Sequence, residues 1–170
     1  MSKITLVLGG TRSGKSVFAE NYVLSTQKQP VYLATAEIFN EEMKKRIKTH
    51  QSRRQSIWIN VEEPVDILKV LQHHNSVDKI VLVDCLSVWL GNLIEHHLDP
   101  EQEMANLVDG LASIEVETVI VASEVGLGIV PENRLAREFS DYAGALNQKI
   151  AAIAANVFFV AAGLPLRLKG

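Results

Sequence analysis

Cysteine is almost absent from this chain, which has one such residue, Cys85, among 170. A single thiol excludes an internal disulfide framework and any zinc site built from several cysteines. That usage suits a reducing cytosol. An excess of one charge is also missing, since 17 Lys and Arg against 20 Asp and Glu leave a formal net charge of −3. No global positive field therefore attracts nucleic acid or an anionic membrane, and an anionic ligand must be held by local donors.

Long apolar runs are missing as well. The apolar run Ile4–Leu8 is too short for a secretory segment and ends in a glycine turn. The stretch Ile150–Leu166 has Asn156 as its only strongly polar side chain, but its length is marginal for a membrane span and Gly163 and Pro165 break its end. We interpret it as a buried helix end followed by a buried strand. We expect a cytoplasmic protein with no membrane insertion.

Short apolar runs that alternate with helical patterns dominate the chain. Hydrophobic residues make up 47% and charged residues 22%, which fits one folded domain over residues 1–170. The alternation predicts an α/β fold with a mostly parallel sheet flanked by crossover helices. The run Ile80–Val83 is apolar without alternation, as in a strand buried on both faces. The expected strands are Lys3–Leu8, Pro30–Thr35, Ser56–Val61, Lys79–Asp84, Thr118–Ala122, Asn156–Ala161 and a short last one at Leu164–Leu168.

Three apolar stripes at helical spacing predict helices that pack on this sheet. Their residues recur every three or four positions, so each stripe forms one face of a helix and belongs to the core. The stripes are Leu86, Leu90 and Leu93; Leu107, Leu111 and Ile114; and Phe139, Ala143, Leu146, Ile150 and Ile153. The dipeptides Asp99-Pro100 and Val130-Pro131 indicate loops.

A phosphate-binding motif of the form G-x-x-x-x-G-K-S follows the first expected strand. It consists of Gly9, Gly10, Thr11, Arg12, Ser13, Gly14, Lys15 and Ser16. Phe18 and Tyr22, one turn apart, indicate a helix directly after it. Backbone N–H groups of such a loop and of the helix N-terminus bind phosphate oxygens. Lys15 can reach the β- and γ-phosphates of a nucleoside triphosphate, and the Ser16 hydroxyl suits Mg²⁺. A glycine-rich turn with an incidental Lys-Ser is the weaker interpretation.

Asp84 closes the apolar run Ile80–Val83, where a second acidic group is expected in this class of site. There it would hold Mg²⁺ directly or through water. Asp also commonly caps the helix that follows it. Both uses are compatible, and the metal role is favoured.

A basic segment, residues 41–54, follows the second expected strand. If it is helical, Arg46, His50, Arg53 and Arg54 lie near one face. Cations there can spread the charge of a transferring phosphoryl group, and a neutral imidazole can act as a nucleophile. From spacing alone, a solvated basic helix is the favoured interpretation.

Taken together, these motifs resemble the bifunctional adenosylcobinamide kinase / adenosylcobinamide-phosphate guanylyltransferase family. The resemblance covers nearly the whole chain. Besides the phosphate loop, it rests on residues 32–37, on Glu42-Met43 with Arg46-Ile47 and His50, on Arg53-Arg54 leading to Trp58, on residues 82–86 and 124–131, and on Phe139 and Asp141 with Gly144, Asn147 and Gln148.

The resemblance implies a RecA-like P-loop fold and two reactions. ATP or GTP phosphorylates adenosylcobinamide, and GMP from GTP is then transferred to adenosylcobinamide phosphate. It implies that His50 carries the GMP covalently, which replaces the solvated-helix interpretation. It also implies Mg²⁺ and a homo-oligomer, namely a trimer. Outside the phosphate loop, the implied nucleotide contacts are Ala34, Thr35, Ala36, Gln51, Ser52, Arg53, Arg54, Glu62 and Asp84.

Two positions depart from the family's pattern. Ser123 stands where members usually have Asn, and Ser140 where they often have Arg. Other classes of function were weighed. Another small-molecule P-loop kinase would transfer phosphate without a covalent nucleotide, and a regulatory NTPase would hydrolyse GTP without transfer. The absence of an Asn-Lys-x-Asp motif argues against the usual GTPases.

Overall fold

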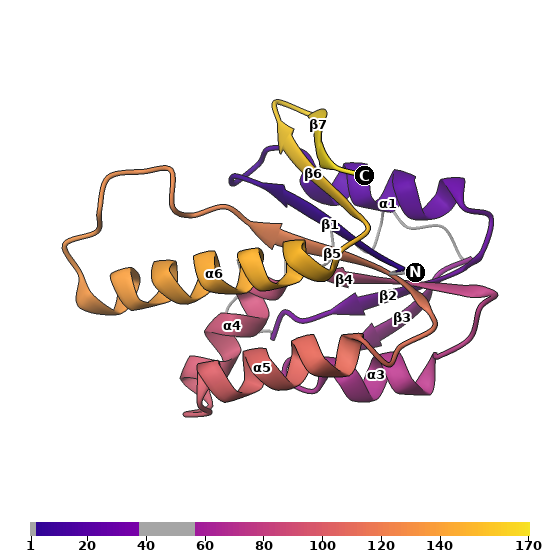
Figure 1. Cartoon of the computed structure of the whole chain (residues 1–170), viewed down its shortest axis with the longest axis horizontal. Helices are drawn as coiled ribbons and strands as arrows, with labels where there is room; N and C mark the ends of the chain where they lie inside the picture. The colour runs from indigo at the N-terminus through magenta and orange to yellow at the C-terminus, as the bar shows by residue number, and fades with distance from the viewer. Residues whose placement is uncertain (1–2, 38–56) are drawn as a thin grey trace.

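A seven-stranded sheet forms the centre of the molecule, in the order β3-β2-β4-β5-β1-β6-β7 (Figure 1). The computed structural model describes residues 3–37 and 57–170. All neighbouring strands are parallel except β6 and β7, which form an antiparallel hairpin at one edge. The strands are β1 Ile4–Gly9, β2 Gln29–Ala34, β3 Ile59–Glu62, β4 Lys79–Asp84, β5 Glu117–Ser123, β6 Asn156–Ala161 and β7 Leu164–Lys169.

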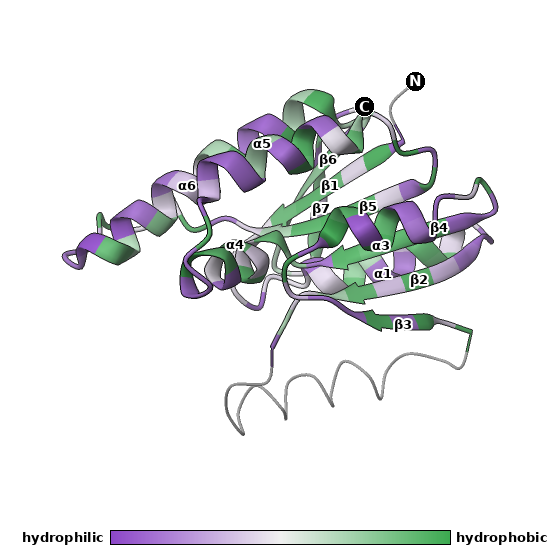
Figure 2. Ribbon diagram, turned by 90° about the horizontal axis from the view of Figure 1, so that it is seen from below, coloured by the Kyte–Doolittle hydropathy of each residue, from purple (hydrophilic) through white to green (hydrophobic). Residues whose placement is uncertain are grey.

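Helices cover both faces of the sheet, as a mostly parallel sheet requires. The helix α1 packs on one face, and α3 to α6 lie on the other (Figure 1). The start of α6 extends beyond the sheet (Figures 1 and 2). The helices are α1 Lys15–Ser25, α3 Ile67–His73, α4 Leu86–Glu95, α5 Pro100–Leu111 and α6 Arg134–Ile153. Of the helices in the described ranges, none has the length and apolar character needed to cross a membrane.

Two apolar clusters, one for each face, hold these layers together. Under α1, Ala19 and Val23 pack with Val7 and Leu82 of the sheet. The larger cluster lies on the other face and includes Trp89, which is 2% exposed. The strands consist mainly of apolar residues, whereas polar and apolar residues alternate along α5 and α6 (Figure 2). The apolar runs of the sequence thus became strands because both of their faces are covered.

The expected α/β class, the seven strands and two of the three helical stripes are confirmed. The stripe of Leu107, Leu111 and Ile114 is confirmed only in part, because α5 ends at Leu111 and Ile114 lies beyond it. The strands Lys79–Asp84 and Asn156–Ala161 have the predicted bounds, and the others shift at their ends. The stretch from Ile150 is a helix end followed by a buried strand, as expected. The short helix α3 was not anticipated, and Pro100 begins α5 rather than a loop. Proline fits there because its fixed φ suits a first helical position, while Asp99 caps the helix.

One buried histidine makes the fold sensitive to acid. His74 follows α3, is 8% exposed, and its Nδ1 has no hydrogen-bond partner among the described residues. Burial, followed by the charge of Lys79 and of His73, lowers the pKa of His74 from 6.5. In this range the unfolded chain therefore binds more protons than the folded chain. The stabilisation by neutral His74 is complete above pH 6.5 and is lost as the pH falls through the lowered folded-state pKa.

We therefore expect the variant His74→Gln to lose less stability on acidification than the wild type. The reason is that glutamine does not titrate, so the cost of burying an imidazolium disappears. Urea unfolding between about pH 7.5 and 5 measures the free energy of unfolding of both proteins. Parallel pH profiles would contradict this role of His74.

Candidate functional site

Those predicted nucleotide residues that the structure describes lie where the parallel strands end. Since the strands run in one direction, their carboxyl ends share one edge of the sheet, the usual place for a ligand in such folds. Ala34 at the end of β2 pairs with Glu62 of β3 on one side and with Asp84 of β4 on the other. Gly9 at the end of β1 pairs with Ser123 of β5. The phosphate loop and Asp84 thus lie at the same edge, with β5 between their strands.

The phosphate loop turns tightly from β1 into α1. The Ser13 N–H donates to the Gly10 carbonyl oxygen at 3.2 Å. Gly14 adopts a left-handed conformation with φ 95°, which favours glycine, and occupies the N-cap position of α1. No side chain caps this helix, so its first N–H groups are available for an anion. The loop therefore has the form that the motif predicted.

Neighbouring strands hold the loop in place. A Cβ added to Gly9 would lie 2.6 Å from the carbonyl oxygen of Val160 and would also overlap the Ser13 hydroxyl. The N–H of Gly163, in the turn between β6 and β7, donates to the Ser13 carbonyl oxygen at 2.7 Å. Only glycine fits at position 9, and the hairpin fixes the outer side of the loop.

Lys15 and Ser16 are the first two residues of α1. The Lys15 Nζ donates to the Gly10 carbonyl oxygen at 3.0 Å, so this ammonium group lies across the loop. Thr11 and Arg12, at the tip of the loop, are exposed. The loop thus presents one fixed cation and its backbone amides to a bound anion.

Asp84 does not cap the helix that follows it. The N-cap of α4 is Cys85, and no side chain caps that helix, so the capping interpretation is wrong. The Asp84 Oδ2 instead accepts a hydrogen bond of 2.9 Å from the Tyr32 hydroxyl. Tyr32 is 4% exposed and makes an edge contact with Trp58. The buried Tyr32 side chain therefore holds the Asp84 carboxylate at the sheet edge formed by the carboxyl ends of the parallel strands.

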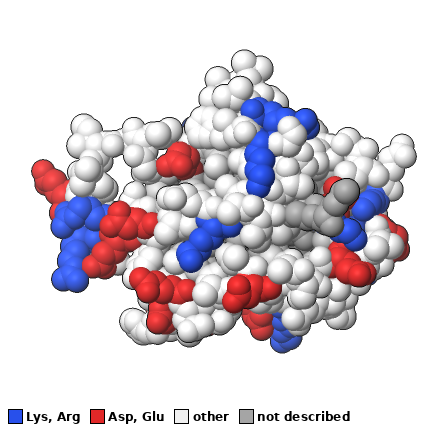
Figure 3. Space-filling view, viewed as in Figure 1, with Lys and Arg blue, Asp and Glu red and all other residues white. Residues whose placement is uncertain are grey.

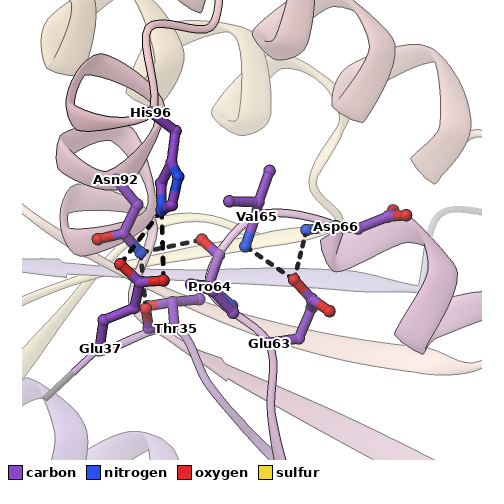
Figure 4. Close-up of polar contacts among 8 residues, drawn as sticks. All are labelled: Thr35, Glu37, Glu63, Pro64, Val65, Asp66, Asn92 and His96. Atoms are coloured by element: carbon purple, nitrogen blue, oxygen red, sulfur yellow. Dashed lines mark hydrogen bonds and ion pairs between the residues drawn. The ribbon is translucent and has the colours of Figure 1, made fainter.

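A second link fixes the segment after β2 to the end of β4. The Thr35 hydroxyl donates to the Cys85 carbonyl oxygen and accepts from the Cys85 N–H, both at 2.9 Å. The side-chain amide of Asn92 in α4 donates to the carbonyl oxygens of Thr35 at 2.7 Å and Pro64 at 2.9 Å (Figure 4). Thr35 and Asn92 are both buried. The predicted contacts Ala34–Ala36 therefore lie on a rigid stretch of backbone.

A contact between a carboxylate and an imidazole lies beside this link. Glu37 contacts the imidazole of His96 at 3.2 Å, next to Asn92 (Figure 4). The Glu63 carboxylate accepts from the N–H groups of Val65 and Asp66 and so shapes the loop before α3 (Figure 4). These contacts order the backbone around the carboxyl ends of β2 and β3.

The thiol of Cys85 is unsuited to nucleophilic attack at neutral pH. Burial, followed by the negative charge of Asp84, raises the pKa of Cys85 to about 11. The thiolate is the reactive form, and it is scarce at pH 7. Cys85 therefore contributes backbone hydrogen bonds to the site rather than a nucleophile.

Several predicted residues lie outside the described part of the chain. They are His50, Gln51, Ser52, Arg53 and Arg54, together with Arg46 of the same basic segment. Their roles stay predictions. Sequence reasoning, in turn, assigned no role to Tyr32, Asn92 or Ser87, whose Oγ accepts from the Ser123 N–H at 2.7 Å. Tyr32 belongs to one of the motifs of the family resemblance, and Asn92 is a polar residue next to Leu93 of an apolar stripe, but neither signal names a partner.

The fold and the loop define a P-loop nucleotide-binding protein. A family model described as cobinamide kinase / cobinamide phosphate guanyltransferase matches residues 5–168. This chain belongs to that family.

Similar proteins span the same length. The bifunctional adenosylcobalamin biosynthesis protein CobP of Pseudomonas aeruginosa is 40% identical, with 97% of this chain and 96% of that protein covered. The bifunctional adenosylcobalamin biosynthesis protein CobU of Escherichia coli is 34% identical, with 96% and 98% covered. A solved protein from Pyrococcus horikoshii has a TM-score of 0.54 at 12% identity, covering 98% of this chain and 86% of its own, which is a likeness of fold alone.

We expect Thr35→Val to destabilise the protein at the sheet edge where the parallel strands end. Valine keeps the shape but removes the Thr35 acceptor from the half-buried Cys85 N–H and one of the two donors to the Cys85 carbonyl oxygen, which still accepts from the Trp89 N–H. The unsatisfied N–H should cost about 1–3 kcal/mol. Urea unfolding gives the change in stability, and titration with ATP gives the change in affinity. Thr35→Ser retains the hydroxyl and is the matched control. Equal losses in the two variants would show that the methyl group of Thr35, and not its hydrogen bonds, matters.

Proposed function

We propose that this protein phosphorylates adenosylcobinamide with ATP or GTP and then transfers GMP from GTP to the product, giving adenosylcobinamide-GDP. Membership of the family and the names of the two relatives support both reactions. The observation that carries the proposal is a phosphate loop, with Lys15 across it, at the same sheet edge as Asp84.

Phosphoryl transfer needs positioning and charge stabilisation more than covalent help from the protein. The loop amides and the N-terminus of α1 bind the phosphates, and Lys15 exchanges its contact with Gly10 for phosphate oxygens. Each group is held by backbone fixed to the sheet, so binding costs little rearrangement. The acceptor hydroxyl attacks the γ-phosphorus and releases its proton to solvent, the bond to the bridging oxygen breaks, and the nucleoside diphosphate leaves.

The donor set at this edge suits Mg²⁺. The carboxylate of Asp84 and the hydroxyl of Ser16 are oxygen ligands, which this cation prefers, and the phosphates of the nucleotide complete such a shell. When bound, the cation neutralises charge on the phosphates. Tyr32 holds one carboxylate oxygen of Asp84, which restricts the rotamer of the side chain.

The guanylyl transfer proceeds in two displacements. A neutral nitrogen of His50 attacks the α-phosphorus of GTP, an N–P bond forms, and pyrophosphate leaves. The phosphate of the acceptor then attacks the same phosphorus, the N–P bond breaks, and the imidazole is regenerated. Arg53 and Arg54 stabilise the charge that develops. Two inversions give net retention at phosphorus and ping-pong kinetics. Glu37, the last described residue before this segment, lies beyond the carboxyl end of β2.

We expect His50→Ala to abolish attachment of GMP but to retain much of the kinase activity, whereas Lys15→Ala should damage both. The reason is that only guanylyl transfer needs the imidazole, while both reactions need the bound triphosphate. Incubation with α-labelled GTP and Mg²⁺ measures an acid-labile, base-stable adduct, and conversion of adenosylcobinamide measures the kinase activity.

The control is His73→Ala, which removes an exposed histidine at the end of α3. It should be labelled like the wild type. Label that persists on His50→Ala protein would refute the nucleophile assignment. Phosphorylation without any adduct on the wild type would favour a simple small-molecule kinase, and GTP hydrolysis without transfer would favour a regulatory NTPase.

Self-association, as a trimer, is part of the same proposal. The edge strand β7 supports it, because Leu164, Leu166 and Leu168 are 73%, 61% and 57% exposed. Exposed apolar side chains on an edge strand are typical of contacts between chains. Sedimentation velocity tests this, and a monomer at micromolar concentration would refute it.

A further inference from the structure

A large cavity lies next to the phosphate loop, outside the site described so far. Its volume is about 950 Å³, at the upper end of the range for ligand pockets. It opens between the end of α4, the start of α6 and the loop that joins β5 to α6. Its wall is mainly apolar and includes Gly91, Ile94, Val125, Leu135, Ala136 and Phe139.

The backbone connects this cavity directly to the phosphate loop. Val125 forms part of the wall, and the N–H of the preceding residue, Glu124, donates to the carbonyl oxygen of Gly9 at 3.0 Å. On the other side, the Ser123 N–H donates to Ser87 at the start of α4. The carboxyl end of β5 thus separates the cavity from the phosphate loop. A ligand in the cavity has one end near the bound phosphates.

A glycine inside α4 opens the cavity. Gly91 lies in the middle of the helix, where glycine costs about 1 kcal/mol relative to alanine. No heavy atom of the described residues lies within 4 Å of a Cβ built at this position, so packing against them does not require glycine there. The adjacent Leu90 and Asn92 are buried. The missing side chain leaves free space on the one side of α4 that faces the cavity.

The loop over the cavity is unusually apolar for an exposed segment. Leu127, Ile129 and Val130 are 80%, 97% and 74% exposed, and the next residue, Pro131, lines the cavity. Uncharged side chains cover this loop, at the upper left of the view (Figure 3). Exposed apolar groups that adjoin a pocket are typical of a surface that binds a large ligand.

The charges of the wall do not favour a second nucleotide. Among the described residues that line the cavity there is no Lys or Arg, whereas phosphates need cations or clustered amides. The polar lining side chains include Glu95, His97 and Ser140. This set suits a bulky ligand that has no phosphate, carries amide groups and has a positive charge. Adenosylcobinamide has this chemistry, since amide side chains surround a macrocycle whose cobalt centre carries a net positive charge.

We propose that this cavity binds the corrinoid acceptor, that is, adenosylcobinamide. This inference rests on the proposed function. The macrocycle packs on the apolar wall beside Gly91, and Glu95 and Ser140 meet its amide rim. The aminopropanol hydroxyl extends past Val125 toward the phosphate loop. Position 140, where the chain departs from its family, is therefore part of the acceptor site.

The test fills the cavity from Gly91. Gly91→Phe adds a large side chain into open space, so the fold should tolerate it, and thermal unfolding checks this. The KM for adenosylcobinamide should rise at least about tenfold, while the KM for ATP stays within about twofold. Gly91→Ala adds only a methyl group and should raise the acceptor KM less. Labelling by α-labelled GTP needs no acceptor and should be unchanged in both variants.

Gly144→Phe is the matched control. Gly144 also lies inside a helix, α6, with no heavy atom within 4 Å of an added Cβ, but it does not line the cavity. This variant should keep the wild-type KM for both substrates. An unchanged acceptor KM in Gly91→Phe would overturn the proposal. An equal rise in the KM for ATP would also overturn it and would assign the cavity to the nucleotide. An altered sedimentation coefficient with an unchanged acceptor KM would overturn it too and would assign the cavity to a contact between copies of the chain.

Equilibrium dialysis with cobinamide, followed by its visible absorbance, separates this inference from the proposed function. Binding to the wild type that is lost in Gly91→Phe supports the cavity even if no phosphate is transferred. In that case the proposed function fails and the binding site stands. If the wild type phosphorylates adenosylcobinamide but the wild type and Gly91→Phe bind cobinamide equally, the proposed function stands and the cavity is not the binding site.

Discussion

Parallel register is the constraint on which the site depends. Six neighbouring strands, β3-β2-β4-β5-β1-β6, run in one direction, so the crossover helices of the described residues return the chain to the opposite edge. The residues that follow the strands then meet at one edge, although Gly9, Glu62 and Asp84 are far apart in sequence. Hydrogen bonds between buried strands fix the register of each pair, and burial on both faces strongly disfavours a slip in that register. The site needs no other device to bring its parts together.

The antiparallel hairpin plays a different role from the parallel strands. It adds no predicted nucleotide residue, but its turn donates a backbone hydrogen bond to Ser13, and Val160 limits position 9 to glycine. A phosphate loop must hold its amides in place before the anion arrives, since unaligned donors would lose entropy on binding. The hairpin β6–β7 therefore restrains the phosphate loop through this hydrogen bond, and the loop continues directly into α1.

Local patterns were sufficient to predict the strands and most helices of this fold, but not the short helix α3 or the contacts between the elements. The run Ile80–Val83 predicts a buried strand by itself, and the glycines with Lys15 predict a phosphate loop. The bonds of Tyr32 to Asp84 and of Thr35 to Cys85 depend on β2 lying beside β4. Strand order is not written in any local pattern, so these partners could not be assigned. The cavity beside Gly91 depends in the same way on how α4 and α6 pack.

The two proposed reactions make different demands on one bound triphosphate. Its phosphates are fixed by a loop that the sheet holds rigid, so the reaction is chosen by the group that reaches a given phosphorus. An acceptor hydroxyl from the cavity approaches over β5, which lies between the phosphate loop and Asp84. The segment that carries His50 leaves the sheet at β2, on the other side of β4. In the proposed scheme the attacking group selects the reaction, so one loop can serve both transfers without rebuilding its own structure.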